Sequence, residues 1–239
     1  EREEKLAQVS CAAALVDQHH CRGSRSLRWD MLLARVPNAI LHSKVSLLYW
    51  ANWVRVIVAS ANLTEDGYRR NQEVFGVLDF PNEGGDIARS CLTDVIEFLR
   101  YAGAFAKGGA AQLPPGLARW NAFLNKAAEA VESWSLPESE KRSTAVSCRP
   151  VFSGPGRTNV MDSIRKLWTG YGPPGEAWVF SPFFDAVADH NKPAESLWKM
   201  LRQRGEAKAV FCVTAEDIPG KPGLLLHAPE SLKKAQPGR

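Results

Sequence analysis

The sequence of 239 residues lacks the features of several protein classes. No stretch approaches the roughly 18 consecutive apolar residues of a membrane-spanning helix, so we expect no stable membrane insertion. The five cysteines are widely spaced and include no Cys-x-x-Cys pair, which argues against a zinc ribbon or a thioredoxin-like site. The motifs Gly-x-Ser-x-Gly and His-Glu-x-x-His and the Walker phosphate loop are also missing, which argues against the hydrolase and nucleotide-binding families that carry them.

The cysteines and histidines that are present indicate little chemistry. Cys11, His19, His20 and Cys21 lie close together in the sequence, but their spacing does not match a structural zinc site, so no metal or other cofactor is expected. Widely spaced thiols are typical of a reducing compartment, which predicts a cytoplasmic protein. The formal charge of +4, from 30 basic and 26 acidic residues, permits an anionic partner without requiring one.

Hydrophobic periodicity predicts an α/β fold in two units. In the first unit, β-rich runs predict strands at 39–49, 54–59 and 75–80, with a chain reversal between the first two at Trp50–Trp53. Apolar residues three and four positions apart predict helices at 86–105 and 117–134. Residues 1–35 carry no clear pattern.

A polar stretch at 136–145 places the boundary between the units, which are therefore 1–142 and 143–239. The second unit alternates strands and helices, and this alternation predicts a parallel or mixed sheet. Its predicted strands are 146–152, 177–183 and 208–213, and its predicted helices are 159–168 and 193–204.

One stretch of the first unit carries a set of polar side chains suited to chemistry. Residues two apart on a strand project to the same face, so His42 and Lys44 are expected to share one surface. Ser60 and Asn62 share a face in the same way, at the end of the partner strand. Glu73 follows Asn62 by eleven residues and is expected to return beneath the same pocket.

These side chains suit attack on a phosphodiester. A neutral imidazole is a nucleophile near pH 7, and a phosphohistidine divides one displacement into two easier steps. A lysine and an amide can stabilise the charge on the non-bridging oxygens. A carboxylate bonded to the other ring nitrogen would fix the tautomer of the histidine. No metal is required by this scheme.

The same stretch resembles a known family. The chain has His-x-Lys at His42 and Ser-x-Asn at Ser60, about sixteen residues after Lys44, and Glu73 follows Asn62 by eleven residues. This pattern resembles the active-site motif of the phospholipase D superfamily. The resemblance implies a phospholipase D-like mixed sheet flanked by helices and a phosphodiesterase in which His42 is the nucleophile or general acid/base. It further implies that Lys44 and Asn62 bind phosphate and that Glu73 orients His42. The predicted catalytic residues are therefore His42, Lys44, Asn62 and Glu73, and the predicted substrate-binding residues are Ser60, Thr64 and Asn71.

One departure from the motif bears on the substrate. Phospholipases of the family have Asp five residues after the lysine, where this chain has Tyr49. The tyrosyl-DNA phosphodiesterase branch also lacks that Asp, so the resemblance favours that branch or nuclease-like relatives. We therefore predict nucleic acid, or a DNA-linked phosphodiester, as the substrate. A phospholipid substrate and a non-catalytic module that binds nucleic acid or phosphate remain the alternatives.

A second departure is that the second motif of the family is missing. His190 and Lys192 match His-x-Lys, but Pro193 follows and no Ser-x-Asn comes after it. His227 has Pro229 where the lysine should stand. The prediction is thus one complete half-site followed by an incomplete second repeat, in a fragment of a longer enzyme. A homodimer that brings together two copies of His42 is the competing account.

Overall fold

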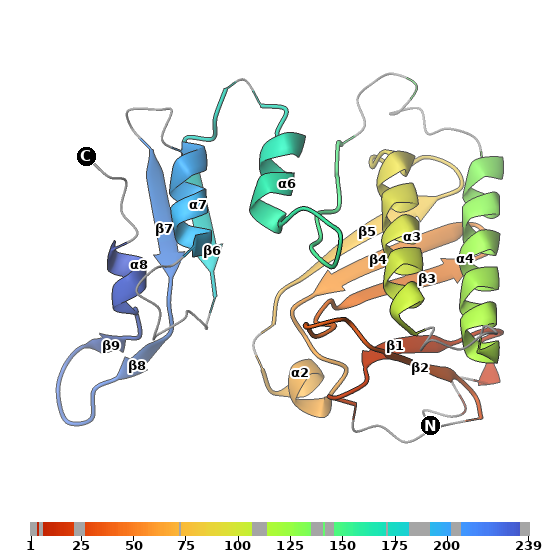
Figure 1. Cartoon of the computed structure of the whole chain (residues 1–239), viewed down its shortest axis with the longest axis horizontal. Coiled ribbons are helices and arrows are strands. Elements are labelled where there is room, and N and C mark those ends of the chain that lie inside the picture. The colour runs from red at the N-terminus through yellow and green to blue at the C-terminus, as the bar shows by residue number, and fades with distance from the viewer. Residues whose placement is uncertain are drawn as a thin grey trace. The chain divides into compact units, whose positions relative to one another are not determined.

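The structure is a computed structural model in which both described units contain helices and strands, confirming the α/β class (Figure 1). The chain divides into two compact units, residues 1–150 and residues 151–239. The described residues are 4, 7–21, 27–71, 73–106, 114–134, 141, 146–170, 172–181, 192–201 and 207–234.

The first unit opens with a pair of parallel strands in the region that showed no clear sequence pattern. Strand β1 (Ala13–Asp17) pairs with β2 (Asp30–Ala34), in a register that runs from Ala13 opposite Asp30 to Asp17 opposite Ala34. Each strand has only five residues, and so short an apolar run cannot be assigned from periodicity alone. The pair ends at Asp17 and Ala34, both buried.

A three-stranded antiparallel sheet follows, with β4 (Trp53–Ala59) between β3 (Val45–Trp50) and β5 (Phe75–Pro81). Trp50 pairs with Trp53 across the turn between β3 and β4, which confirms the predicted chain reversal. Val54 and Val56 are fully buried and alternate with more exposed residues, as expected for a sheet with one face on the core.

The prediction that residues 39–49 form one strand is wrong over its first half, because β3 begins only at Val45. Two features divert the backbone before that point. Asn38 has a positive φ of 54°, which no extended strand contains. The N–H of Leu41 donates to the carboxylate of Asp17 rather than to a neighbouring strand. His42 and Lys44 therefore lie on the segment that leads into β3, and the argument from alternating strand faces does not apply to them.

Two long helices complete the first unit, α3 (Arg89–Gly103) and α4 (Pro115–Ser133), which contact each other. A 3-10 turn, η1 (Ala104–Ala106), follows α3, and a short helix, α2 (Glu65–Arg69), lies between β4 and β5. Both long helices match their predicted ranges closely. Their apolar stripes form much of the core, with Cys91, Leu92, Val95, Ile96 and Leu99 of α3 and Leu117, Leu124, Ala127 and Val131 of α4 buried.

The second unit alternates helices and strands as predicted, and further elements follow its last predicted strand. Helix α6 (Val160–Leu167) precedes β6 (Glu176–Phe180), and α7 (Lys192–Leu201) precedes β7 (Lys208–Cys212). Strands β6 and β7 are parallel. They are followed by a small antiparallel pair, β8 (Ala215–Asp217) and β9 (Leu224–Leu226), and by helix α8 (Glu230–Lys234).

Two expectations about the sheets need correction. The predicted strand at 146–152 is reduced to an isolated parallel bridge between Val146 and Ile87, and Pro150, which has no N–H for a ladder, follows soon after. The single mixed sheet is replaced, among the described residues, by four separate sheets: parallel β1–β2 and β6–β7, and antiparallel β3–β4–β5 and β8–β9. His190, part of the rejected second triplet, lies outside the described residues.

Candidate functional site

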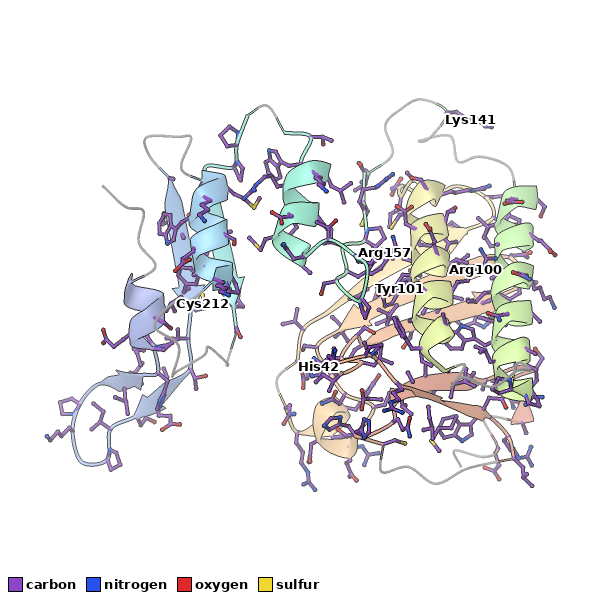
Figure 2. The ribbon with its side chains drawn as sticks, viewed as in Figure 1. His42, Arg100, Tyr101, Lys141, Arg157 and Cys212 are labelled. Atoms are coloured by element: carbon purple, nitrogen blue, oxygen red, sulfur yellow. The ribbon has the colours of Figure 1, made fainter. Side chains whose placement is uncertain are left out.

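His42 and Lys44 are brought together on the segment that enters β3, where Figure 2 labels His42. The Lys44 Nζ atom lies 3.3 Å from both ring nitrogens of His42 and donates to the His42 carbonyl oxygen at 3.0 Å. Only the unprotonated ring nitrogen can accept a hydrogen bond from the ammonium. The Lys44 carbonyl accepts the Ala59 N–H at 3.0 Å, which attaches this segment to the end of β4.

A second group of site residues forms around Glu73, just before β5. The Ser60 hydroxyl donates to one carboxylate oxygen of Glu73, and the Asn71 amide donates to the other at 3.3 Å. Ser60 is held in turn by the backbone of Val74, whose N–H donates to the hydroxyl at 3.0 Å and whose carbonyl accepts the Ser60 N–H at 2.9 Å. The Glu73 carboxylate is thus fixed by two side chains from both ends of the β4–β5 connection.

Lys44 links these two groups electrostatically. Partial burial lowers the pKa of the Lys44 ammonium from its ordinary value, because a charged group loses hydration there, and the nearby negative charge of Glu73 opposes the shift. Glu73 therefore lies close enough to stabilise the ammonium that contacts His42. A bound anion would act in the same direction as Glu73 and raise the pKa of Lys44.

Asn62 and Thr64 lie in the turn between β4 and α2, and their local roles are structural. Thr64 is the N-cap of α2: its hydroxyl accepts the Gly67 N–H at 3.1 Å. Gly67 is buried, and a Cβ atom there would overlap the carbonyl oxygen of Asn62. The absence of a side chain at Gly67 thereby sets the position of the Asn62 backbone. The Asn62 side chain itself is exposed.

The structure therefore brings together some of the predicted site residues and not others. His42 contacts Lys44, and Lys44 interacts with the charge of Glu73, which Ser60 and Asn71 hold. In the described parts of the chain, no hydrogen bond joins Glu73 or the Asn62 side chain to His42. The orienting role of Glu73 and the phosphate-binding role of Asn62 stay predictions.

Asp17 is a residue near the site that sequence reasoning missed. Its buried carboxylate accepts the N–H of Leu41, the residue before His42, at 2.8 Å, and the N–H of His19 at 2.9 Å. The Nδ1 atom of His20 lies 2.9 Å from the same carboxylate. These bonds, with Leu41 first, lower the pKa of Asp17 to about 2. In the sequence, the His19-His20 pair is the feature that marks this region, and it gives no indication of the bond between Asp17 and Leu41.

His42 is exposed. Cavities of about 240 and 310 Å³ lie elsewhere, one between α3 and α4 and one beside α6 and α7, and neither is lined by a residue of the candidate site. Across the described residues, no cluster of three or more His, Cys, Asp or Glu side chains could hold a metal ion. Within the same residues, no helix is long and apolar enough to cross a membrane.

Comparison with known proteins identifies no relative. No protein-family model matches the chain, and neither the curated proteins nor the solved structures contain a significant match.

Proposed function

We propose that the chain is a phosphodiesterase with a phospholipase D-like half-site, in which His42 attacks the phosphorus of a nucleic-acid phosphodiester. The observation that carries the proposal is the contact of the Lys44 ammonium with both ring nitrogens of His42. A nucleophile and a cation that can bind the phosphate oxygens are therefore adjacent, with His42 exposed and Lys44 half-buried. Glu73, from the segment before β5, adds a third charged or titratable side chain to His42 and Lys44, which share the segment before β3.

The proposed reaction has two displacements. A ring nitrogen of His42 attacks phosphorus, a P–N bond forms, and the bond from phosphorus to the leaving oxygen breaks with its electron pair on that oxygen. Water then attacks the same phosphorus, the P–N bond breaks, and one proton of the water is released as the phosphomonoester leaves. Lys44 stabilises the negative charge on the non-bridging oxygens in both steps.

The phospholipase D-like fold is part of the proposal. Each unit contains a pair of parallel five-residue strands, β1–β2 in the first and β6–β7 in the second. This shared feature supports a repeat in which the first unit carries the motif and the second repeat is incomplete. The missing half-site then comes from a further part of the protein or from a second copy of the chain.

Two features favour nucleic acid over a phospholipid as the substrate. Tyr49 stands at the position of the phospholipase Asp. Its ring packs edge-on against Phe123 of α4, with ring centroids 6.3 Å apart, and so takes part in packing within the first unit. His42 and Asn62 lie on an exposed surface rather than in an apolar cavity, and an open surface can accommodate a polymer backbone.

The test is hydrolysis of bis(p-nitrophenyl) phosphate by the 239-residue chain. Its p-nitrophenolate leaves without needing a proton, so the first displacement does not depend on a missing second histidine. Lys44→Gln is expected to lower kcat by about 10²- to 10³-fold, because one donor to the phosphoryl oxygens is lost. The matched control is Lys199→Gln on α7, which should leave kcat unchanged.

A single-stranded oligonucleotide and a phosphatidylcholine vesicle, used as separate substrates, distinguish the alternatives. Cleavage of the oligonucleotide with chelator present supports the proposal. Binding of the oligonucleotide without cleavage, unaffected by His42→Ala, indicates a non-catalytic module and overturns it. Release of choline from the vesicle at a higher kcat/KM than that for the oligonucleotide indicates a phospholipase.

A further inference from the structure

We propose that Asp17 is a positioning residue for His42, acting through its hydrogen bond to the N–H of Leu41. This inference rests on the proposed function, since it assigns a residue outside the motif to the same site. Asp17 lies 24 residues before Leu41 and belongs to the β1–β2 strand pair, whereas Leu41 lies in the connection before β3.

Asp17 can hold Leu41 in place because strand pairing fixes the Asp17 backbone. It is the last residue of β1 and pairs with Ala34 at the end of β2, where the ladder continues with the Gln18 N–H donating to the Ala34 carbonyl at 2.9 Å. Ala34 is fully buried, and the Asp17 residue is 8% exposed. A buried carboxylate is stable only when it is well hydrogen-bonded, and Asp17 has three partners.

Between Arg35 and the Lys44 carbonyl, which accepts the Ala59 N–H, the segment that Asp17 holds has few other attachments. Residues 35–44 connect β2 to β3 without strand pairing. At its start, the Arg35 N–H donates to the Phe105 carbonyl at 3.0 Å, and the Ala39 N–H makes only a local bond to Val36. The Leu41 bond is the next attachment along the chain, one residue before His42. Without it, we expect the backbone that carries His42 to sample several positions.

Asp17 contacts the Leu41 backbone and the His20 side chain through different carboxylate oxygens. One carboxylate oxygen accepts the Leu41 N–H, whereas the other faces His20 and His19. His20 is 66% exposed, so its imidazole can be removed without opening the core. The contacts of Asp17 with Leu41 and with the His20 side chain can therefore be tested independently.

The experiment measures amide exchange at Leu41 and the ring signals of His42 by NMR in the full chain, with inorganic phosphate as the probe. Asp17→Asn leaves a single, neutral carbonyl oxygen for three donors, so Leu41 exchange should accelerate about tenfold. The His42 ring signals should broaden or shift, and their response to phosphate should weaken. His20→Ala is the matched control and should leave Leu41 exchange and the phosphate response unchanged.

The kinetics give a second readout that loss of stability alone would not produce. With bis(p-nitrophenyl) phosphate, Asp17→Asn should lower kcat by up to about 100-fold through misplacement of His42, with little change in KM. Unchanged exchange of the Gln18 amide would show that β1 is still paired with β2. If Asp17→Asn does not fold, the His42 ring signals and their response to phosphate are measured in His20→Ala and in Leu41→Pro, which removes the N–H. Normal His42 signals in Leu41→Pro overturn the role.

The outcomes separate this inference from the proposed function. Leu41 exchange or a phosphate response that does not change in Asp17→Asn overturns the positioning role, whatever the activity of the wild-type chain. A wild-type chain that hydrolyses nothing, but whose Leu41 amide and His42 ring respond to Asp17→Asn as described, supports the positioning role and overturns the proposed function.

Discussion

Each unit contains a histidine that follows a parallel strand pair and a leucine-containing stretch. The surroundings of these two histidines differ. His42 follows the β1–β2 pair and is met by Lys44 at 3.3 Å. His227 follows the β6–β7 pair and lies 3.3 Å from a carboxylate oxygen of Glu216, with Pro229 in the position that matches Lys44. A neighbouring carboxylate repels an anion, so these surroundings of His227 are less suited to bind a phosphate than those of His42.

The backbone around the two histidines differs as well. Leu41, the residue before His42, donates its N–H to the buried Asp17. Val45, the residue after Lys44, begins strand β3 of the three-stranded sheet. The His227 N–H is bonded to Thr214 at 2.9 Å, beside a pair of exposed three-residue strands. The two histidines therefore differ in the backbone contacts around them as well as in the presence of a lysine two residues later.

The largest expected effect comes from removing each histidine. His42→Ala should lower the kcat for bis(p-nitrophenyl) phosphate by about 10³-fold or more, because the nucleophile is lost. His227→Ala should leave kcat within about twofold, as for a surface residue. Steady-state kinetics of the two variants measure this difference, and equal losses in both would show that the two regions do not differ as proposed.

The next largest effect tests the close contact between Gly67 and the backbone of Asn62. Gly67→Ala forces a methyl group against the Asn62 carbonyl and should lower the free energy of unfolding by about 1–3 kcal/mol. Gly76 of β5 is the control: a Cβ atom there meets nothing within 4 Å, so Gly76→Ala should stay within about 0.5 kcal/mol. Urea unfolding measures both. A Gly67→Ala variant as stable as Gly76→Ala would contradict the described packing.

The smallest effect compares the caps of two helices, one in each unit. Thr64 caps α2 and Asn159 caps α6, where its side chain accepts the Asp162 N–H at 2.9 Å. Replacing either with Ala should cost about 1 kcal/mol of local stability, seen as faster amide exchange in that helix only. Thr64→Ser should restore the exchange rates of α2. We expect activity to fall with Thr64→Ala, since α2 follows shortly after Asn62 of the candidate site.

Much of the first unit could be predicted from the sequence because its patterns are long or strongly marked. The hairpin at Trp50–Trp53 and the helices α3 and α4 follow directly from alternation and from helical periodicity. Strands β1 and β2 could not be found in this way, since each is short and pairs with a strand more than ten residues distant. The strand predicted at 39–49 failed because Asn38 and Asp17 act against it, and neither effect is visible in hydrophobicity.

The contacts among the candidate site residues could be predicted from the sequence only in part. The motif spacing placed His42 with Lys44 and Ser60 near Glu73, and both pairs are in contact. It did not foresee that Thr64 would cap a helix, that Gly67 would set the position of Asn62, or that Asp17 would hold Leu41. These contacts depend on the three-dimensional path of the chain between β2 and β3 and between β4 and β5.

The most direct test of the central claim is the search for a covalent intermediate on His42. The wild-type chain is mixed with bis(p-nitrophenyl) phosphate, quenched in alkali, digested and analysed by mass spectrometry. The account predicts a p-nitrophenyl phosphoryl adduct on His42 that is stable in alkali, lost in acid and missing from His42→Ala. Hydrolysis by the wild-type chain with the adduct on another residue, or with activity retained in His42→Ala, would contradict it.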